Sequence, residues 1–91
     1  SQPFLFIVAD GMGGHSAGNV ASQMAVENTI AGFLQAPDGD MSDRLRHSIE
    51  EANRKIYDAA QANADYFRMG TTIVGAAVLG NRADIANVGD S

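Results

Sequence analysis

The sequence predicts an α+β fold whose elements follow the order strand, helix, helix, strand, strand. Three observations support this fold class. Residues 4–9 form a continuous apolar run, which is typical of a buried strand. Residues 18–35 and 42–62 carry apolar side chains at helical spacing. Residues 71–79 alternate between two faces and lead through a Gly-Asn pair into a second short run, the pattern of a β-hairpin.

Length and composition limit the possible functions. The chain has 91 residues, enough for one small domain or part of a larger one, and 45% of them are hydrophobic, which excludes a disordered segment. A net charge of -5 argues against binding to nucleic acid and favours cations or basic peptides. Cysteine is absent, which excludes disulfides and thiolate chemistry and suits a cytoplasmic protein. No apolar run is long enough to span a membrane.

The first strand and the first helix are predicted from the N-terminal half. Residues 4–9 lie between Pro3 and Asp10, and because every residue of the run is apolar we expect the strand to be buried on both faces. The first helix is expected from about Gly18 to Gln35. Its predicted apolar side is lined by Val20, Met24, Ala31 and Leu34, and widened by Val26, Ile30 and Phe33. The Pro-Asp-Gly content of residues 36–40 indicates a turn.

The second helix has the clearest amphipathic pattern of the chain. Ser42 is the predicted N-cap, and the helix is expected to end near Ala62. Its apolar stripe is formed by Leu45, Ile49, Ala52, Ile56 and Ala59. Because the turn between the two helices is short, we expect them to be antiparallel neighbours.

Two strands complete the predicted order. In residues 71–79 both faces are apolar or small, which favours a strand inside a layered structure. Gly80 and Asn81 tolerate the backbone conformations of a two-residue hairpin turn, and residues 82–88 form the predicted return strand. The chain starts just before one strand and stops just after another, so we expect both ends to cut through a larger fold.

The segment FIVADGMGGHSAGNVAS, residues 6–22, holds the first candidate site. Asp10 places a carboxylate at the end of a strand, and Gly11 leaves its own carbonyl oxygen uncovered. Gly13 and Gly14 let the backbone pass close to something compact. A carboxylate next to a bare carbonyl suits Mg²⁺ or Mn²⁺. Taken alone, however, the segment fits an ordinary Asp-Gly turn before a helix better than a metal site.

Two further motifs lie at strand ends. RMGTT, residues 68–72, opens the second predicted strand, and NVGDS, residues 87–91, closes the last one. Each motif alone is also compatible with a simple strand start or turn. Together they place a second carboxylate, Asp90, after another buried strand. Two strand-end carboxylates can face one cleft, and carboxylates converge around metal ions.

These segments resemble the metal-dependent PPM, or type 2C-like, family of protein serine/threonine phosphatases, in particular its bacterial branch. The resemblance rests on VADGMGGH, MGTT and ANVGDS in this order, and on IEEANRKIYDAAQAN between them. It covers nearly the whole chain. It implies that this chain forms part of a four-layer α-β-β-α sandwich with a metal centre between its two sheets.

The resemblance also implies a chemistry and a set of ligands. The family hydrolyses phosphoserine and phosphothreonine proteins by direct attack of a water activated by two Mg²⁺ or Mn²⁺ ions. The residue matching Asp10 bridges the two ions, and the one matching Gly11 offers its carbonyl, generally through a bound water. The residue matching Asp90 is associated with a third, weaker metal site. The family's phosphate-binding arginine and its other metal-ligating acids have no counterpart in these residues.

One departure from the family pattern concerns the general acid. Many eukaryotic members carry a histidine directly after the Asp-Gly pair, where this chain has Met12. His15 follows three positions later, and it fits a histidine hydrogen-bonded to backbone at a helix entry better than an acid catalyst. The position of the general acid therefore stays open.

Three hypotheses follow for the function. The first is that the chain is the N-terminal part of a PPM-type phosphatase and is active only within the full domain. The second is a non-catalytic truncated module acting in binding or oligomerisation. The third, ranked last, is an unrelated Mg²⁺-binding α/β domain. One carboxylate and one carbonyl cannot hold two hard cations, so we expect the isolated chain to be inactive. Half of a sandwich exposes what the other half should cover, so we also expect the isolated chain to form a dimer or higher oligomer.

Overall fold

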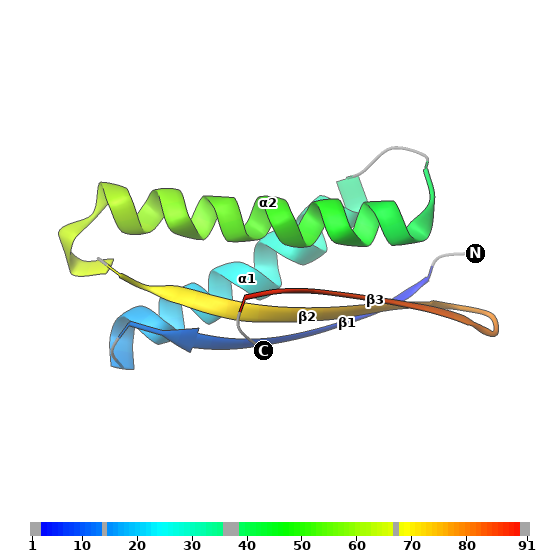
Figure 1. Cartoon of the computed structure of the whole chain (residues 1–91), viewed down its shortest axis with the longest axis horizontal. Helices are drawn as coiled ribbons and strands as arrows, with labels where there is room; N and C mark the ends of the chain where they lie inside the picture. Colours follow the sequence, from blue (N-terminus) through cyan, green and yellow to red (C-terminus); the bar gives the residue numbers. More distant parts are fainter. Residues whose placement is uncertain (1–2, 14, 36–38, 67, 90–91) are drawn as a thin grey trace.

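The computed structural model describes residues 3–13, 15–35, 39–66 and 68–89. One three-stranded antiparallel sheet packs against two long helices, and Figure 1 shows α2 running along the strands. The predicted α+β class and the predicted order of elements are confirmed, with one additional short 3₁₀ helix. The elements are β1 (Phe4–Met12), α1 (His15–Gln35), α2 (Met41–Ala62), η1 (Ala64–Tyr66), β2 (Gly70–Leu79) and β3 (Arg82–Val88).

The sheet has the strand order β1-β2-β3, with β2 in the centre. In the antiparallel register, Ile7 lies opposite Gly75 and Ile73 lies opposite Val88. The predicted hairpin turn is confirmed, and Gly80 takes a φ of +63° that favours glycine there. β3 has the bounds that the sequence predicts, and the two-residue turn places Leu79 opposite Arg82 in the hairpin.

The helices cover one face of the sheet, with α1 packed mainly on β1 and α2 on β2 and β3. Period-2 alternation along β2 directs Ile73 and Ala77 into the core, where both are fully buried. The largest fully buried side chains are Phe33, Leu45, Ile49, Ile56, Ile73, Thr29 and Ser48. The core therefore lies between the helical layer and the sheet.

The other face of the sheet is open, which corrects the prediction that the first strand is buried on both sides. Phe4 is 71% exposed, Val8 is 70% exposed and Ile85 on β3 is 73% exposed. The physical reason is that the described residues supply helices for one face only. β1 is also three residues longer than predicted, because Gly11 and Met12 continue to pair with β2.

Helix α1 differs from its prediction in its start and in its buried face. It begins at His15, and the predicted apolar residue Leu34 is 65% exposed. Of the predicted stripe, Phe33 is fully buried. It ends a row of otherwise small buried residues at intervals of four: Ala17, Ala21, Ala25 and Thr29. Small side chains let α1 approach the sheet and α2 closely. Close packing, and not the total hydrophobicity of a face, therefore decides which face of α1 is buried.

Helix α2 follows its predicted stripe but has a different cap. The predicted end at Ala62 is confirmed, and the stripe from Leu45 to Ile56 is buried. The N-cap is Asp40 rather than Ser42, because the Asp40 carboxylate accepts a hydrogen bond of 3.1 Å from the Ser42 backbone N–H. The predicted turn at 36–40 falls largely on residues 36–38, which lie outside the described residues.

The two helices are fastened to each other by Arg44 of α2. Its guanidinium lies 4.2 Å from the centre of the Phe33 ring, and its Nη2 donates a hydrogen bond of 2.7 Å to the Phe33 carbonyl oxygen. Phe33 belongs to the last turn of α1, where carbonyl groups lack helical partners. Arg44 therefore caps the C-terminus of α1 while it packs on its last aromatic ring.

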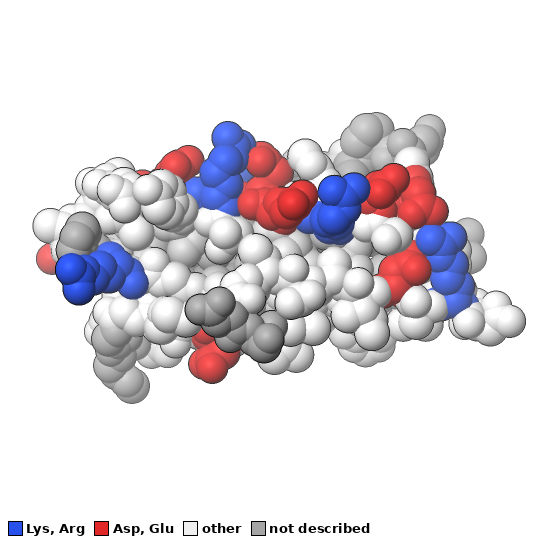
Figure 2. All heavy atoms as spheres, viewed as in Figure 1, with Lys and Arg blue, Asp and Glu red and all other residues white. Residues whose placement is uncertain are grey.

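Charged side chains gather along α2, as the upper part of Figure 2 shows, and much of the surface over the strands in this view is uncharged. Exposed pairs such as Arg54–Glu51, at 2.7 Å, lie on the solvent face of α2. Surface pairs of this kind contribute little to stability. Neither described helix combines the length and the apolar character needed to cross a bilayer.

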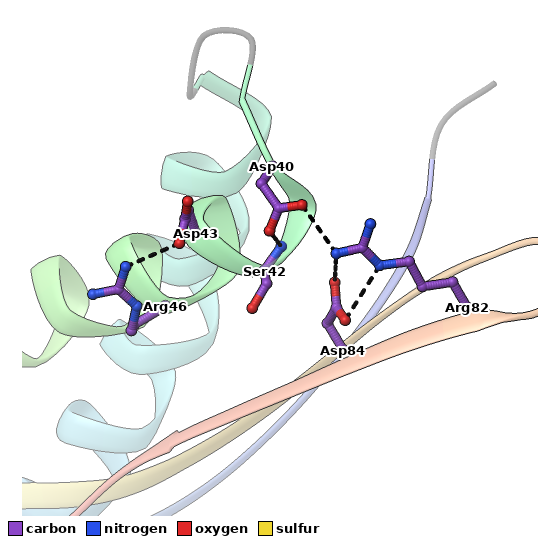
Figure 3. Close-up of polar contacts among 6 residues, drawn as sticks. All are labelled: Asp40, Ser42, Asp43, Arg46, Arg82 and Asp84. Atoms are coloured by element: carbon purple, nitrogen blue, oxygen red, sulfur yellow. Dashed lines mark hydrogen bonds and ion pairs between the residues drawn. The ribbon is translucent and has the colours of Figure 1, made fainter.

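The hairpin is tied to the start of α2 by a cluster of charges, shown in Figure 3. Arg82 Nη2 lies 3.0 Å from Asp40 Oδ1 and forms an ion pair of 2.9 Å with Asp84 Oδ2. The hydrogen bond from Arg82 lowers the pKa of the Asp40 carboxyl below its usual 3.8. The pKa of Arg82 is raised by its hydrogen bonds to Asp84, which has the larger effect, and to Asp40.

This cluster predicts an acid-sensitive contribution to stability. A carboxyl whose pKa is lowered by folding stabilises the fold above its unfolded-state pKa, and that contribution is lost as the pH falls through the folded-state pKa. Asp40→Asn keeps a capping oxygen and removes the charge. We expect the variant to be less stable than the wild type near pH 7, and we expect the difference to disappear at acid pH once the wild-type Asp40 carboxyl is protonated in the folded state, as measured by denaturant unfolding. A stability difference that does not change with pH would contradict this.

Candidate metal centre

The three motifs found in the sequence meet at one end of the sheet. The antiparallel register places Asp10 opposite Thr72 and Gly11 opposite Thr71, so the Asp-Gly and Gly-Thr-Thr motifs are direct neighbours. Gly89, of the third motif, lies against Thr72 from the other side, since a Cβ on Gly89 would lie 3.1 Å from Thr72 Cα. β2 thus brings the ends of β1 and β3 together.

Asp10 presents its carboxylate on the open face of the sheet. Along β1 the exposed positions alternate with half-buried ones, and Val8, Asp10 and Met12 share the exposed set. The carboxylate is therefore accessible to an ion or a substrate, and the side chain contributes nothing to the core. Met12, which follows the Asp-Gly pair, is 53% exposed on the same face.

Gly11 lies against the first turn of α1. A Cβ at this position would lie 1.8 Å from the Gly18 carbonyl oxygen, so no side chain can replace the hydrogen of Gly11 without moving the helix. Two backbones therefore touch at this point. The contact carries the chain from the end of β1 directly onto the helical layer.

Gly13 explains part of the glycine-rich loop. Its φ of +122° favours glycine, and a Cβ there would lie 2.6 Å from Met69 Cα. The compact neighbour that the sequence predicts for this glycine is thus the backbone of Met69. Met69 itself is 5% exposed, so it also packs in the core. Gly14 lies outside the described residues.

The donors at this end of the sheet are suited in kind to a hard divalent cation. Asp10 provides carboxylate oxygens, and Gly11 provides a carbonyl oxygen that no side chain of its own covers. In residues 3–13, 15–35, 39–66 and 68–89, no group of three or more His, Cys, Asp or Glu side chains could hold an ion. Asp10 and Gly11 therefore supply only part of a coordination shell.

Two predicted residues cannot be placed in this geometry. Asp90, predicted as a ligand of a further metal ion, lies outside the described residues. His15 begins α1, and its side chain also lies outside the description. Sequence reasoning missed Gly18, whose role follows from the contact with Gly11. The sequence places Gly18 at the expected start of the first helix, where a glycine gives no signal of a contact with Gly11.

The geometry defines a class: an antiparallel sheet covered by helices on one face, with oxygen donors for a hard cation at one end of that sheet. The family model described as "Protein phosphatase 2C" matches residues 1–91, and the chain belongs to this family.

Individual relatives agree with this assignment. The chain is 43% identical over 97 aligned positions to the serine/threonine phosphatase stp of Listeria monocytogenes, covering 100% of this chain and 37% of the relative. It superposes with a TM-score of 0.82 on the serine/threonine phosphatase Stp1 of Staphylococcus aureus, at 40% identity, covering 97% of this chain and 36% of that one.

A third relative is the catalytic domain of the serine/threonine protein phosphatase PstP, solved in complex with two manganese ions. The TM-score is 0.79 at 35% identity, and the match covers 94% of this chain and 37% of that structure. The chain thus spans little more than a third of the length of the relatives that it matches. The family resemblance found in the sequence is confirmed.

Proposed function

We propose that this chain is the N-terminal part of a metal-dependent protein serine/threonine phosphatase. The observation that carries the proposal is the convergence of the three motifs, with Asp10 and Gly89 on either side of Thr72. An exposed strand-end carboxylate has no structural use in the core, whereas it is well suited to bind a cation. The membership in the protein phosphatase 2C family supports the same function.

Each residue has a distinct part in the proposal. The Asp10 carboxylate would hold the metal ions. The Gly11 carbonyl oxygen would bind one of these ions, either directly or through a water molecule bound to that ion. When bound, two Mg²⁺ or Mn²⁺ ions supply a water of lowered pKa and offset the charge of the phosphate. Asp90 contributes to a third ion site. The manganese ions of PstP support the choice of metal.

The substrates are proposed to be proteins phosphorylated on serine or threonine. The names of the relatives, serine/threonine phosphatase stp and Stp1, support this class. The open face beside Asp10 is apolar, with Phe6 and Val8 next along β1. Because a second layer that covers this face must also border Asp10, the complete site is expected to lie between two layers.

The test uses the full-length protein. We expect hydrolysis of para-nitrophenyl phosphate and of a phosphothreonine peptide that requires millimolar Mn²⁺ and is abolished by EDTA. Addition of excess Mn²⁺ after EDTA should restore the activity. Hydrolysis that EDTA leaves unchanged, or the absence of any Mn²⁺-dependent hydrolysis in the folded protein, would overturn the proposal.

A further inference from the structure

Gly18 lies where an ordinary side chain would press on the proposed metal ligand. A Cβ added to Gly18 would lie 3.1 Å from the Gly11 carbonyl oxygen, 3.2 Å from the Gly11 carbonyl carbon and 3.4 Å from the Met12 backbone nitrogen. The two shorter distances are tighter than ordinary contacts and force the neighbouring atoms to move by a few tenths of an ångström. The atoms that must move are those of the Gly11 peptide itself.

The Gly11 peptide has little room to move in other directions. On one side, Gly11 and Met12 are paired with Thr71 and Gly70 in the sheet. Directly after them, Gly13 is held against Met69 by its close backbone contact. Gly18 itself is buried in the first turns of α1. A methyl group on Gly18 would therefore press on the face of the Gly11 peptide and displace its carbonyl group.

We propose that Gly18 is a positioning residue for the metal centre, which keeps the Gly11 carbonyl oxygen in place. The inference rests on the proposed function, because it treats this carbonyl as a ligand. It assigns Gly18 a role beyond helix packing. Ligand positions held by neighbouring groups matter for affinity, since disturbing such a neighbour typically weakens metal binding tenfold or more.

The chain offers a matched control in the same helix. A Cβ added to Gly32 would meet the Ser48 side chain at 3.5 Å, an ordinary contact distance. Gly18→Ala and Gly32→Ala raise helix propensity in the same way. They differ in what the new methyl group touches: the Gly11 peptide in one case and a side chain of α2 in the other.

The experiment measures Mn²⁺ binding to the full-length protein by calorimetry, without substrate. We expect Gly32→Ala to bind Mn²⁺ as the wild type does, and Gly18→Ala to bind it roughly tenfold more weakly. At saturating Mn²⁺ the KM of Gly18→Ala for a phosphothreonine peptide should be unchanged. A merely structural role would not separate the metal affinity from KM in this way.

Other results would overturn the inference in distinguishable ways. If the wild type binds no Mn²⁺, the proposed function fails and the inference falls with it. If the wild type binds Mn²⁺ and Asp10→Asn weakens that binding, but Gly18→Ala binds like Gly32→Ala, only the role of Gly18 is wrong. Gly18→Ala is also made in the Gly32→Ala background, where the higher helix propensity favours folding. If the double variant does not fold, Gly18 is required for folding and its role in positioning the Gly11 carbonyl is wrong.

Discussion

Replacing Asp10 by alanine in the full-length protein is expected to reduce turnover on the order of a hundredfold or more. The reason is that the proposal makes the Asp10 carboxylate the negatively charged ligand that the described part of the chain supplies to the metal ions. The fold should survive, because Asp10 points away from the core between the helices and the sheet, as the alternating burial along β1 shows. Turnover with Mn²⁺ and the melting temperature are measured on the same sample.

A matched control separates charge from ligation. Asp58 is also an exposed aspartate, but it lies on α2, on the helical side of the sheet. Asp58→Ala removes the same charge and should leave turnover close to that of the wild type. An Asp10→Ala variant that unfolds, or that keeps most of its turnover, would contradict the assignment of Asp10 as a ligand.

The second large effect concerns the isolated 91-residue chain, which should be inactive and self-associated. Its open face exposes Phe4, Phe6, Val8 and Ile85. Covering several hundred Å² of such surface contributes on the order of 10 kcal/mol before the costs of association. One carboxylate and one carbonyl cannot hold two hard cations, so no turnover is expected even with millimolar Mn²⁺.

Sedimentation equilibrium at micromolar concentration measures this association. We expect a dimer or a higher oligomer, and we expect Phe6→Glu, on the open face, to shift it toward monomer. Tyr57→Glu is the control, because Tyr57 is 62% exposed on the helical side and lies outside that face. A folded monomer of the unmodified chain, with helical circular dichroism, would show that the open face needs no cover.

The elements with a strong local pattern could be predicted from the sequence. The stripe of α2 repeats Leu45, Ile49, Ala52 and Ile56 at helical spacing, and its interior contains no competing signal. The hairpin was equally predictable, since Gly80 supplies a backbone conformation that favours glycine and so fixes where β3 begins. In both cases the signal lies within the segment itself.

Features that depend on tertiary contacts were predicted poorly. The buried face of α1 consists largely of alanines, and a hydrophobicity pattern gives more weight to Val20, Met24 and Leu34. The open face of β1 could not be read from its apolar run, because the sequence of a strand does not show how many layers will cover it. The choice between Asp40 and Ser42 as the N-cap could not be made from the sequence, because aspartate and serine both suit that position.

The site was predictable in its members but not in its contacts. Asp10 and Gly11 stood out as a carboxylate and a bare carbonyl at a strand end. The pairing of Asp10 with Thr72 explains why the Gly-Thr-Thr motif accompanies them. The contact between Gly11 and Gly18 joins a strand to a helix seven positions later, and no local rule of sequence reading predicts it.

The most direct test of the metal centre is a crystal structure of the full-length protein grown with Mn²⁺, with anomalous data collected at the manganese edge. The account predicts an anomalous peak at coordination distance from the Asp10 carboxylate, with the Gly11 carbonyl oxygen facing that ion or a water bound to it. Manganese peaks that lie only elsewhere, with Asp10 in contact with solvent alone, would contradict it.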